Sequence, residues 1–150
     1  IVWENILKMW ARLLPESEES AVWLYNKDCF PQLASMHKVV GVGGVPVWLP
    51  PGGASASPYA TLIGRPMLPM EQCKTLGTVG DLILFDPGRY LVIEKGAIQA
   101  AVSIHVRFLQ HETAFRWKLR NNGQPLLRTA MTPANGTNTL SSMVAVATRS

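Results

Sequence analysis

Charged side chains are scarce in this sequence. Lysine, arginine, aspartate and glutamate make up 16% of the 150 residues, against about 25% in an ordinary soluble domain. The hydrophobic fraction is 47%, which is ordinary and supplies enough apolar side chains for the core of one domain of this length. A chain with a normal core and few charges is expected to cover part of its surface with other protein.

Several other features are missing, and each absence argues against a class of protein. No apolar run reaches the roughly 18 to 20 residues that cross a bilayer, so we expect no membrane partner. The 12 glycines and 11 prolines are too few and too scattered for a disordered or collagen-like chain. The chain opens with IVWENILKMWARLL, which lacks the basic leader of a secretory signal. We therefore expect a processed or truncated product of a longer polypeptide.

Cysteines and histidines are few and widely spaced. Cys29 and Cys73 could pair, but two buried free thiols in a reducing compartment are the expected state. The three histidines, His37, His105 and His111, do not have the spacing of a metal site. The sequence therefore predicts no metal ion, no cofactor and no catalytic residue. A small enzyme that uses these Cys and His side chains stays open as the least favoured alternative.

Two further motifs suggest chemistry but have simpler interpretations. The GVGG at 41–44 lacks the Lys-Ser/Thr of a phosphate loop, and the VPVWLPP after it cannot begin a helix. Asp81 and Asp86 flank the apolar LILF, and we interpret them as turn residues at strand ends rather than as a general acid and base.

The order of elements predicts an α+β fold. Apolar spacing predicts a helix over 3–14, and Pro15 with the acidic PESEES ends it. A strand at 21–26, a helical turn at 30–36 and a long loop at 41–58 follow. The remaining chain predicts strands at 61–68, 80–86, 89–95, 97–108 and 142–148. Helices come early and strands late, without the alternation of a parallel α/β protein.

Positive charge gathers in the last third of the chain. Residues 105–150 hold six basic side chains and one acid, a net charge of +5. Within them FRWKLR (115–120) alternates apolar and basic residues, which predicts a half-buried strand with a cationic outer face. The NNG at 121–123 then predicts a hairpin turn, with a return strand from Gln124 to Met131. The basic row suits an acidic protein surface or nucleic acid, or it is a solvated strand face.

One long stretch carries a family resemblance. TLIGRPMLPMEQCKTLGTVGDLILFDPGRYLVIEKG, from residue 61, resembles the signature region of tailed-phage major capsid proteins of the Hong Kong ninety-seven type. That family shows L-G-x-P, then G-D-aliphatic, then D-x-x-x-Y. The matching residues here are Leu62, Gly64, Pro66, Gly80, Asp81, Asp86 and Tyr90.

The resemblance continues in order along nearly the whole chain. SIHVRFLQHETAFRWKLRNNGQPLLR resembles the aromatic–basic strand of the family and its R-x-[ND]-G-x-P turn, filled here by Arg120, Asn122, Gly123 and Pro125. Upstream, ENILKMWARL and AVWLYNKDCFPQL resemble the helix and strand that precede the signature.

The resemblance implies a phage major capsid fold. Residues 1–100 and 119–150 would be mainly the axial (A) domain, and 101–118 a returning strand segment of the peripheral (P) domain. The N-terminal arm, the extended loop and the spine helix of the family are lacking.

The resemblance also implies a structural subunit that is not an enzyme. Such subunits self-assemble into hexamers and pentamers of an icosahedral bacteriophage or prophage shell that encloses DNA. The implied partners are other copies of the same protein, with a scaffold protein and packaged double-stranded DNA held by non-specific charge contact. The implied location is the virion, after assembly in the bacterial host cytoplasm. The alternative is the shell of an encapsulin-type compartment, which shares the fold but encloses cargo enzymes.

Contacts between subunits are expected at the 41–58 loop and near the predicted hairpin tip at 121–123. The candidate contact residues are Trp48, Arg107, Arg116, Lys118, Arg120 and Asn122. An aromatic anchor supplies buried area, whereas exposed cations mainly set register and specificity.

Overall fold

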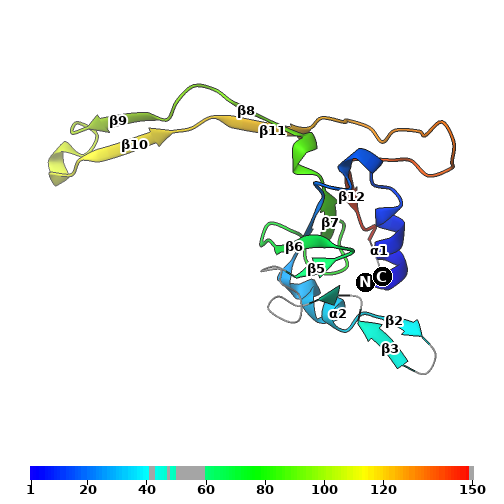
Figure 1. The fold of residues 1–150 in the computed structure, drawn as a ribbon. Coiled ribbons are helices and arrows are strands. Elements are labelled where there is room, and N and C mark those ends of the chain that lie inside the picture. The colour runs from blue at the N-terminus through cyan, green and yellow to red at the C-terminus, as the bar shows by residue number, and fades with distance from the viewer. Residues whose placement is uncertain (41–42, 47, 50–59, 149–150) are drawn as a thin grey trace. The chain divides into compact units, whose positions relative to one another are not determined.

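The computed structural model of the chain describes the backbone of residues 1–40, 43–46, 48–49 and 60–148, and the side chains of residues 1–36 and 60–148. The chain divides into two units (Figure 1). The first unit consists of residues 1–89 and 127–150, and the hairpin unit consists of residues 90–126.

A mixed six-stranded sheet is the centre of the first unit, in the order β12-β7-β1-β6-β5-β4. Its strands are β1 (Val22–Tyr25), β4 (Trp48–Leu49), β5 (Thr61–Leu62), β6 (Arg65–Pro69), β7 (Leu82–Phe85) and β12 (Met143–Ala145). β1 pairs parallel with β6 and antiparallel with β7, and β12 forms one edge. A separate hairpin pairs β2 (His37–Val40) with β3 (Gly43–Pro46).

The helices of the first unit are short. They are α1 (Trp3–Trp10), α2 (Phe30–Ala34) and the single 3-10 turns η1 (Pro15–Ser17), η2 (Lys27–Cys29) and η3 (Pro87–Arg89). The longest described helix has eight residues, whereas a membrane-crossing helix needs about 20. None of the described helices is therefore a membrane span.

The core of the first unit is built around Trp23 in the middle strand. Trp23 lies opposite Leu84 of β7 and Met67 of β6, and all three side chains are buried. The indole Nε1 donates a hydrogen bond to the backbone oxygen of Leu62 at 2.9 Å, so the polar atom of the ring is satisfied. Ile6 of α1 belongs to the same cluster. These positions explain why the apolar alternation in β1 and β7 predicts strands correctly.

Two predicted boundaries in the first unit are wrong. The predicted strand 61–68 is two strands, β5 and β6, joined by a turn in which Ile63 and Gly64 have φ angles of 52° and 70°. Positive φ at both turn residues suits a two-residue hairpin. The predicted helix 3–14 ends as an α-helix at Trp10, because the amides of Arg12 and Leu13 bond three residues back rather than four.

The hairpin unit is two long antiparallel segments (Figure 1). Its elements are β8 (Tyr90–Glu94), β9 (Gln99–Ser103), η4 (Phe108–Gln110), β10 (Ala114–Lys118) and β11 (Asn121–Pro125). β8 pairs with β11, with Tyr90 opposite Pro125. β9 pairs with β10, with Ser103 opposite Ala114. The chain reverses between β9 and β10.

The turn predicted at NNG is therefore wrong. Residues 121–123 lie in β11 and pair with β8. The predicted strand 97–108 ends at Ser103, where β9 ends, and the predicted return strand ends at Pro125, where β11 ends. Gly123 does not supply a positive φ. A Cβ on Gly123 would lie 2.6 Å from Cε1 of Tyr90, so this glycine leaves room for the tyrosine ring on the neighbouring strand.

The predicted loop 41–58 contains two short strands, Gly43–Pro46 of β3 and Trp48–Leu49 of β4. The other residues of this loop, 41–42, 47 and 50–58, lie outside the described residues. The side chain of Trp48 also lies outside the described side chains, so its expected role as an anchor stays a prediction. The mixture of a few helices with several sheets agrees with the predicted α+β class.

Candidate inter-subunit surface

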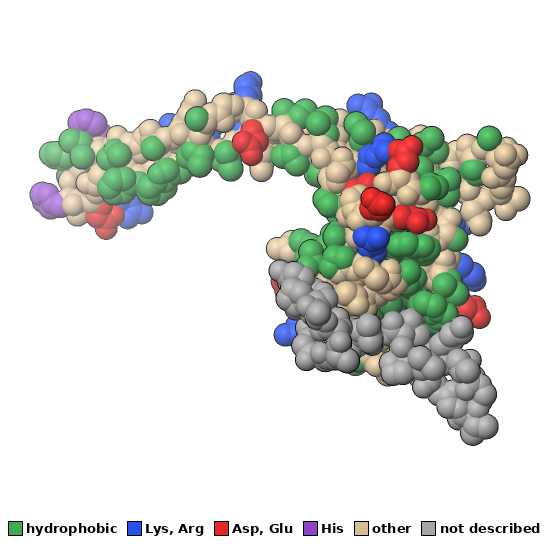
Figure 2. All heavy atoms as spheres, viewed as in Figure 1, with side chains coloured by type: hydrophobic (Ala, Val, Ile, Leu, Met, Phe, Trp, Pro, Cys, Tyr) green, Lys and Arg blue, Asp and Glu red, His purple; other side chains and the backbone are tan. Residues whose placement is uncertain are grey.

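One face of the β9–β10 segment is apolar. Phe115 lies opposite Val102 and Trp117 opposite Ala100, and side chains two apart on a strand share a face. We call these four residues the apolar hairpin face. Trp117 is 69% exposed and Phe115 60%, and their rings stack with centroids 6.0 Å apart and planes 12° apart. Figure 2 shows hydrophobic side chains along the hairpin. No described residue of the chain buries these rings.

The other face of the same segment is cationic. Arg116 and Lys118 alternate with the aromatic residues along β10 and lie opposite Ala101 and Gln99. We call Arg116 and Lys118 the cationic hairpin face. The predicted alternation is confirmed, but the predicted half-burial is wrong for the chain by itself, because a two-stranded hairpin has no second layer to cover its apolar side.

Strand β8 presents apolar side chains on both of its faces, whereas its partner β11 is mostly polar. Leu91, Val92 and Ile93 are consecutive, so their side chains alternate between faces, and they are 45%, 57% and 57% exposed. Sequence reasoning did not nominate these residues. The signal that could have found them is the unbroken run YLVI, which is typical of a strand covered on both faces.

The tip of the hairpin, residues 104–113, adds further exposed apolar side chains. Phe108 is 68% exposed and Leu109 is 89% exposed. Arg107 in this tip forms an ion pair with Glu112, with 2.7 Å between Nη1 and Oε2. The guanidinium of Arg107 therefore already has a carboxylate partner within the tip, whereas a cation that is available for a neighbouring subunit would have none.

The structure separates the predicted contact residues. Arg116 and Lys118 share one face of β10, and Arg107 lies in the tip. Asn122 is not at the tip: it lies in β11 opposite Ile93, where its Oδ1 accepts a hydrogen bond from the Gly123 amide at 2.9 Å. Arg120 follows β10, and its backbone oxygen accepts from the Lys95 amide at 2.9 Å. Trp48 belongs to the first unit.

The two acids that flank the LILF strand have structural partners. Asp81 accepts hydrogen bonds from the amides of Gly77 and Leu82, at 2.9 and 2.8 Å. Asp86 accepts from the Ser20 hydroxyl at 2.7 Å and from the Gly88 amide at 2.9 Å. Both carboxylates therefore hold turns at the ends of β7, as their interpretation as turn residues predicts.

The described cysteines do not have the environment of a reactive thiol. Cys29 and Cys73 are buried thiols that do not form a disulfide, as predicted. Burial raises the pKa of the Cys73 thiol, and the negative charge of Asp81 raises it further, which is the opposite of what an activated nucleophile needs. His105 and His111 belong to the hairpin unit and the cysteines to the first unit. The described residues hold no group of three potential metal ligands.

Comparison with known proteins first defines the class of fold. The chain resembles a chain in the solved capsid of an empty GTA particle with C5 symmetry, with a TM-score of 0.57 and 14% sequence identity. The similarity covers 81% of this chain and 40% of that one. The fold is therefore that of a capsid protein, and this chain spans 40% of the length of that relative.

The family follows from the sequence model. The model of the phage capsid family matches residues 1–136, so the chain belongs to the phage capsid family. A search of curated proteins found no match. The expected family is confirmed.

Proposed function

We propose that this chain is part of the structural subunit of a bacteriophage shell, and that its hairpin unit packs against other copies of the same protein. The observation that carries this proposal is the apolar hairpin face, on which Phe115 and Trp117 stack in the open. Exposed, contiguous apolar surface marks protein interaction sites. Membership of the phage capsid family supports the same conclusion.

The two hairpin faces contribute differently to such a contact. Burying a large apolar side chain contributes about 1.5–3 kcal/mol, so Phe115 and Trp117 supply most of the affinity. An exposed ion pair of Arg116 or Lys118 contributes at most about 1 kcal/mol. The cationic hairpin face therefore sets register and specificity, against acidic neighbours or the phosphates of packaged DNA.

A hairpin with two chemically different faces suits a closed ring of subunits. Hexamers and pentamers need heterologous contacts, in which one surface of each subunit meets a different surface of the next. In this proposal, residues 90–126 are the returning strand segment of the peripheral domain, a wider segment than 101–118, and the first unit is mainly the axial domain. The shell forms in the host cytoplasm with a scaffold protein and encloses double-stranded DNA.

The test is assembly of the protein that contains this chain, expressed with its scaffold and viewed by negative-stain electron microscopy. We expect closed shells from the wild type. The double variant Phe115→Ser/Trp117→Ser should give no shells, and Arg116→Glu/Lys118→Glu should give fewer. Lys27→Glu/Arg128→Glu makes the same change of charge in the first unit and should assemble normally.

Wild-type yields of shells from Phe115→Ser/Trp117→Ser would refute the proposed role of the apolar hairpin face. Circular dichroism and elution volume check that each variant is folded. Nucleic acid in the purified wild-type shells distinguishes a DNA-enclosing capsid from a compartment that encloses cargo enzymes.

A further inference from the structure

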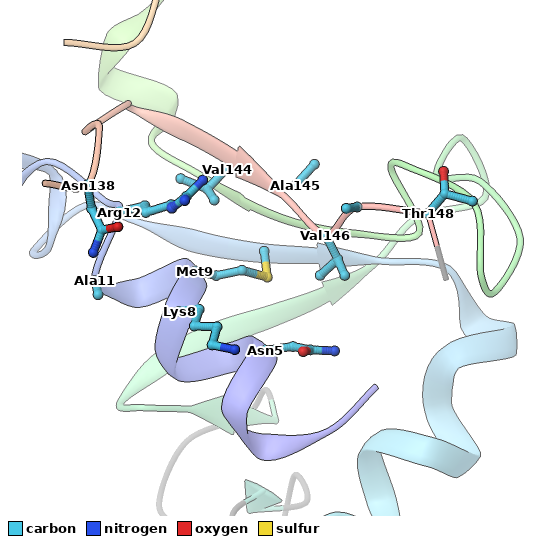
Figure 3. Close-up of a pocket in the computed structure, with 11 residues that line it drawn as sticks. Asn5, Lys8, Met9, Ala11, Arg12, Asn138, Val144, Ala145, Val146 and Thr148 are labelled. Carbon is cyan, nitrogen blue, oxygen red and sulfur yellow. The ribbon is translucent and has the colours of Figure 1, made fainter. Parts of the chain in front are cut away.

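A second surface lies entirely in the first unit, between α1 and β12. An open groove of about 620 Å³ separates the helix from the strand (Figure 3). Residues 144–148 line one side, and Lys8 and Arg12 line the other, with the amides of Asn5 and Asn138. None of the described residues that line the groove is acidic. Met9 and Val146 point toward one another at its floor, so the groove combines an apolar floor with a cationic rim.

The strand side of the groove is an open sheet edge. β12 is the last strand in the order of the sheet, and β7 is its partner among the described strands. Just before β12, Ser141 pairs with Leu13, so the edge is open only from Met143 onward within the described residues. Ser142 accepts from the amide of Asp86 at 3.0 Å, and the amide of Val146 donates to Leu82 at 3.4 Å. Backbone groups alternate in direction along an antiparallel strand, so those of Ala145 and Ala147 point away from β7. Such groups are a template for a further strand.

The spacing of the two cations matches an extended chain. Lys8 lies in the last turn of α1 and Arg12 in the tighter turn after it, and four residues rise about 6 Å in an α-helix and about 8 Å in a 3-10 turn. Alternate side chains of a strand are separated by about 6.6 Å. The ion pairs among the described residues are Arg89 with Glu16 and Arg107 with Glu112, so Lys8 and Arg12 have no carboxylate partner within this part of the chain.

We propose that this groove binds an extended acidic peptide segment, which adds as a strand to the edge of β12 and places alternating carboxylates on Lys8 and Arg12. Main-chain hydrogen bonds supply affinity in this type of recognition, and alternate side chains supply specificity. The observations favour a peptide over nucleic acid, because the edge alternates N–H donors with C=O acceptors above an apolar floor, and carbonyl oxygens repel phosphates whereas a peptide strand satisfies both kinds of group. The site lies outside the hairpin unit, so its binding can be measured separately from the contacts of the apolar hairpin face.

The test uses the full chain and a fluorescein-labelled nine-residue peptide that alternates glutamate and valine, with binding followed by fluorescence anisotropy at low salt. We expect saturable binding, and no binding of the matching lysine–valine peptide. Lys8→Glu/Arg12→Glu should weaken binding at least about tenfold, since like charges then face each other.

Ala145→Pro tests strand addition directly. It removes an amide that points to the open edge but leaves the bonds of Ser142 and Val146 to β7 intact, and edge strands tolerate proline. We expect a loss of at least about tenfold in affinity, because backbone bonds to the peptide are lost. Ala145→Val keeps the amide and changes only the side chain, so the affinity that Ala145→Pro loses beyond Ala145→Val is the part due to the amide. Equal losses for the two variants would overturn strand addition. Circular dichroism confirms that the variants are folded.

A second form of the test leaves the protein unchanged. A peptide of the same charge with two adjacent central prolines cannot pair as a strand, so we expect it to bind at least about tenfold more weakly. Equal binding of this peptide, or of a twelve-nucleotide oligothymidylate, would show a plain polyanion contact and overturn the proposal. Absence of binding by the glutamate–valine peptide would also overturn it, whether or not the protein forms shells.

Discussion

Asp86 holds the end of β7 to the turn that follows it. Its carboxylate accepts from the Ser20 hydroxyl and the Gly88 amide. Burial by itself raises the pKa of this carboxyl. The hydrogen bonds from the Ser20 hydroxyl and the Gly88 amide, together with the charge of Arg89, outweigh burial, so the pKa of Asp86 is lower than usual. The ionised form is therefore the one that stabilises the fold.

Replacing Asp86 by asparagine should destabilise the first unit by about 1–2 kcal/mol at pH 7, because hydrogen bonds to a charged acceptor are lost. A pKa below its unfolded value of about 3.9 gives stability that is present above that pH and is lost as the pH falls through the folded pKa. The difference between wild type and Asp86→Asn should therefore shrink below about pH 4.

Urea unfolding at pH 7, 5 and 3 measures this difference. Asp28→Asn removes an exposed carboxylate as the control and should change stability little at each pH. A destabilisation by Asp86→Asn that is the same at pH 3 as at pH 7 would contradict the role of the ionised carboxylate.

At the scale of elements, the β5–β6 turn depends on one glycine. Gly64 has a φ of 70°, and a Cβ there would meet no atom within 4 Å. The cost of a side chain at this position is thus backbone strain alone. We expect Gly64→Ala to destabilise the first unit by about 1 kcal/mol and Gly64→Asn by less, since asparagine tolerates positive φ.

Tryptophan fluorescence during urea unfolding is a suitable readout for this turn, because Trp23 bonds to the backbone of Leu62 beside it. If Gly64→Ala and Gly64→Asn lowered the free energy of unfolding equally, the positive φ would not explain why glycine is needed at this position.

The strands of the core could be predicted from the sequence because their burial is local to this chain. Trp23 and Leu84 lie in short apolar segments whose alternation matches a sheet with one buried face. The same reasoning failed at Asn121–Gly123. Turn-forming residues there are overridden by pairing with β8, and Gly123 serves the ring of Tyr90 instead of a turn.

The candidate surface could be predicted only in part. The alternation of aromatic and basic residues in β10 placed Arg116 and Lys118 on one face correctly. Sequence alone did not show that Phe115 and Trp117 are exposed, because burial of an apolar strand face depends on which layer covers it. Arg107 could not be excluded as a free cation without the tip geometry that pairs it with Glu112.

At the scale of the whole molecule, the two units differ in how they are stabilised. The first unit has a core cluster around Trp23, whereas the hairpin unit consists of paired strands with exposed faces. An isolated two-stranded hairpin is at best marginally stable. In the chain alone, we expect the amides of β9 and β10 to exchange with solvent at least about tenfold faster than those of β1 and β7.

Hydrogen exchange followed by mass spectrometry measures this difference, and the same peptides should become protected in assembled shells. Protection of β9 and β10 equal to that of β1 in the chain alone would mean that the hairpin is stabilised without any partner.

The pairing of Tyr90 with Pro125 has a consequence for how this protein can vary. The chain enters and leaves the hairpin across one antiparallel residue pair, whose Cα atoms are about 5 Å apart. Residues can thus be inserted or deleted as matched pairs in the two strands of the hairpin unit, while Arg89 and Leu127 keep their positions in the first unit. The length of the hairpin unit and the stability of the core sheet can therefore change independently during evolution.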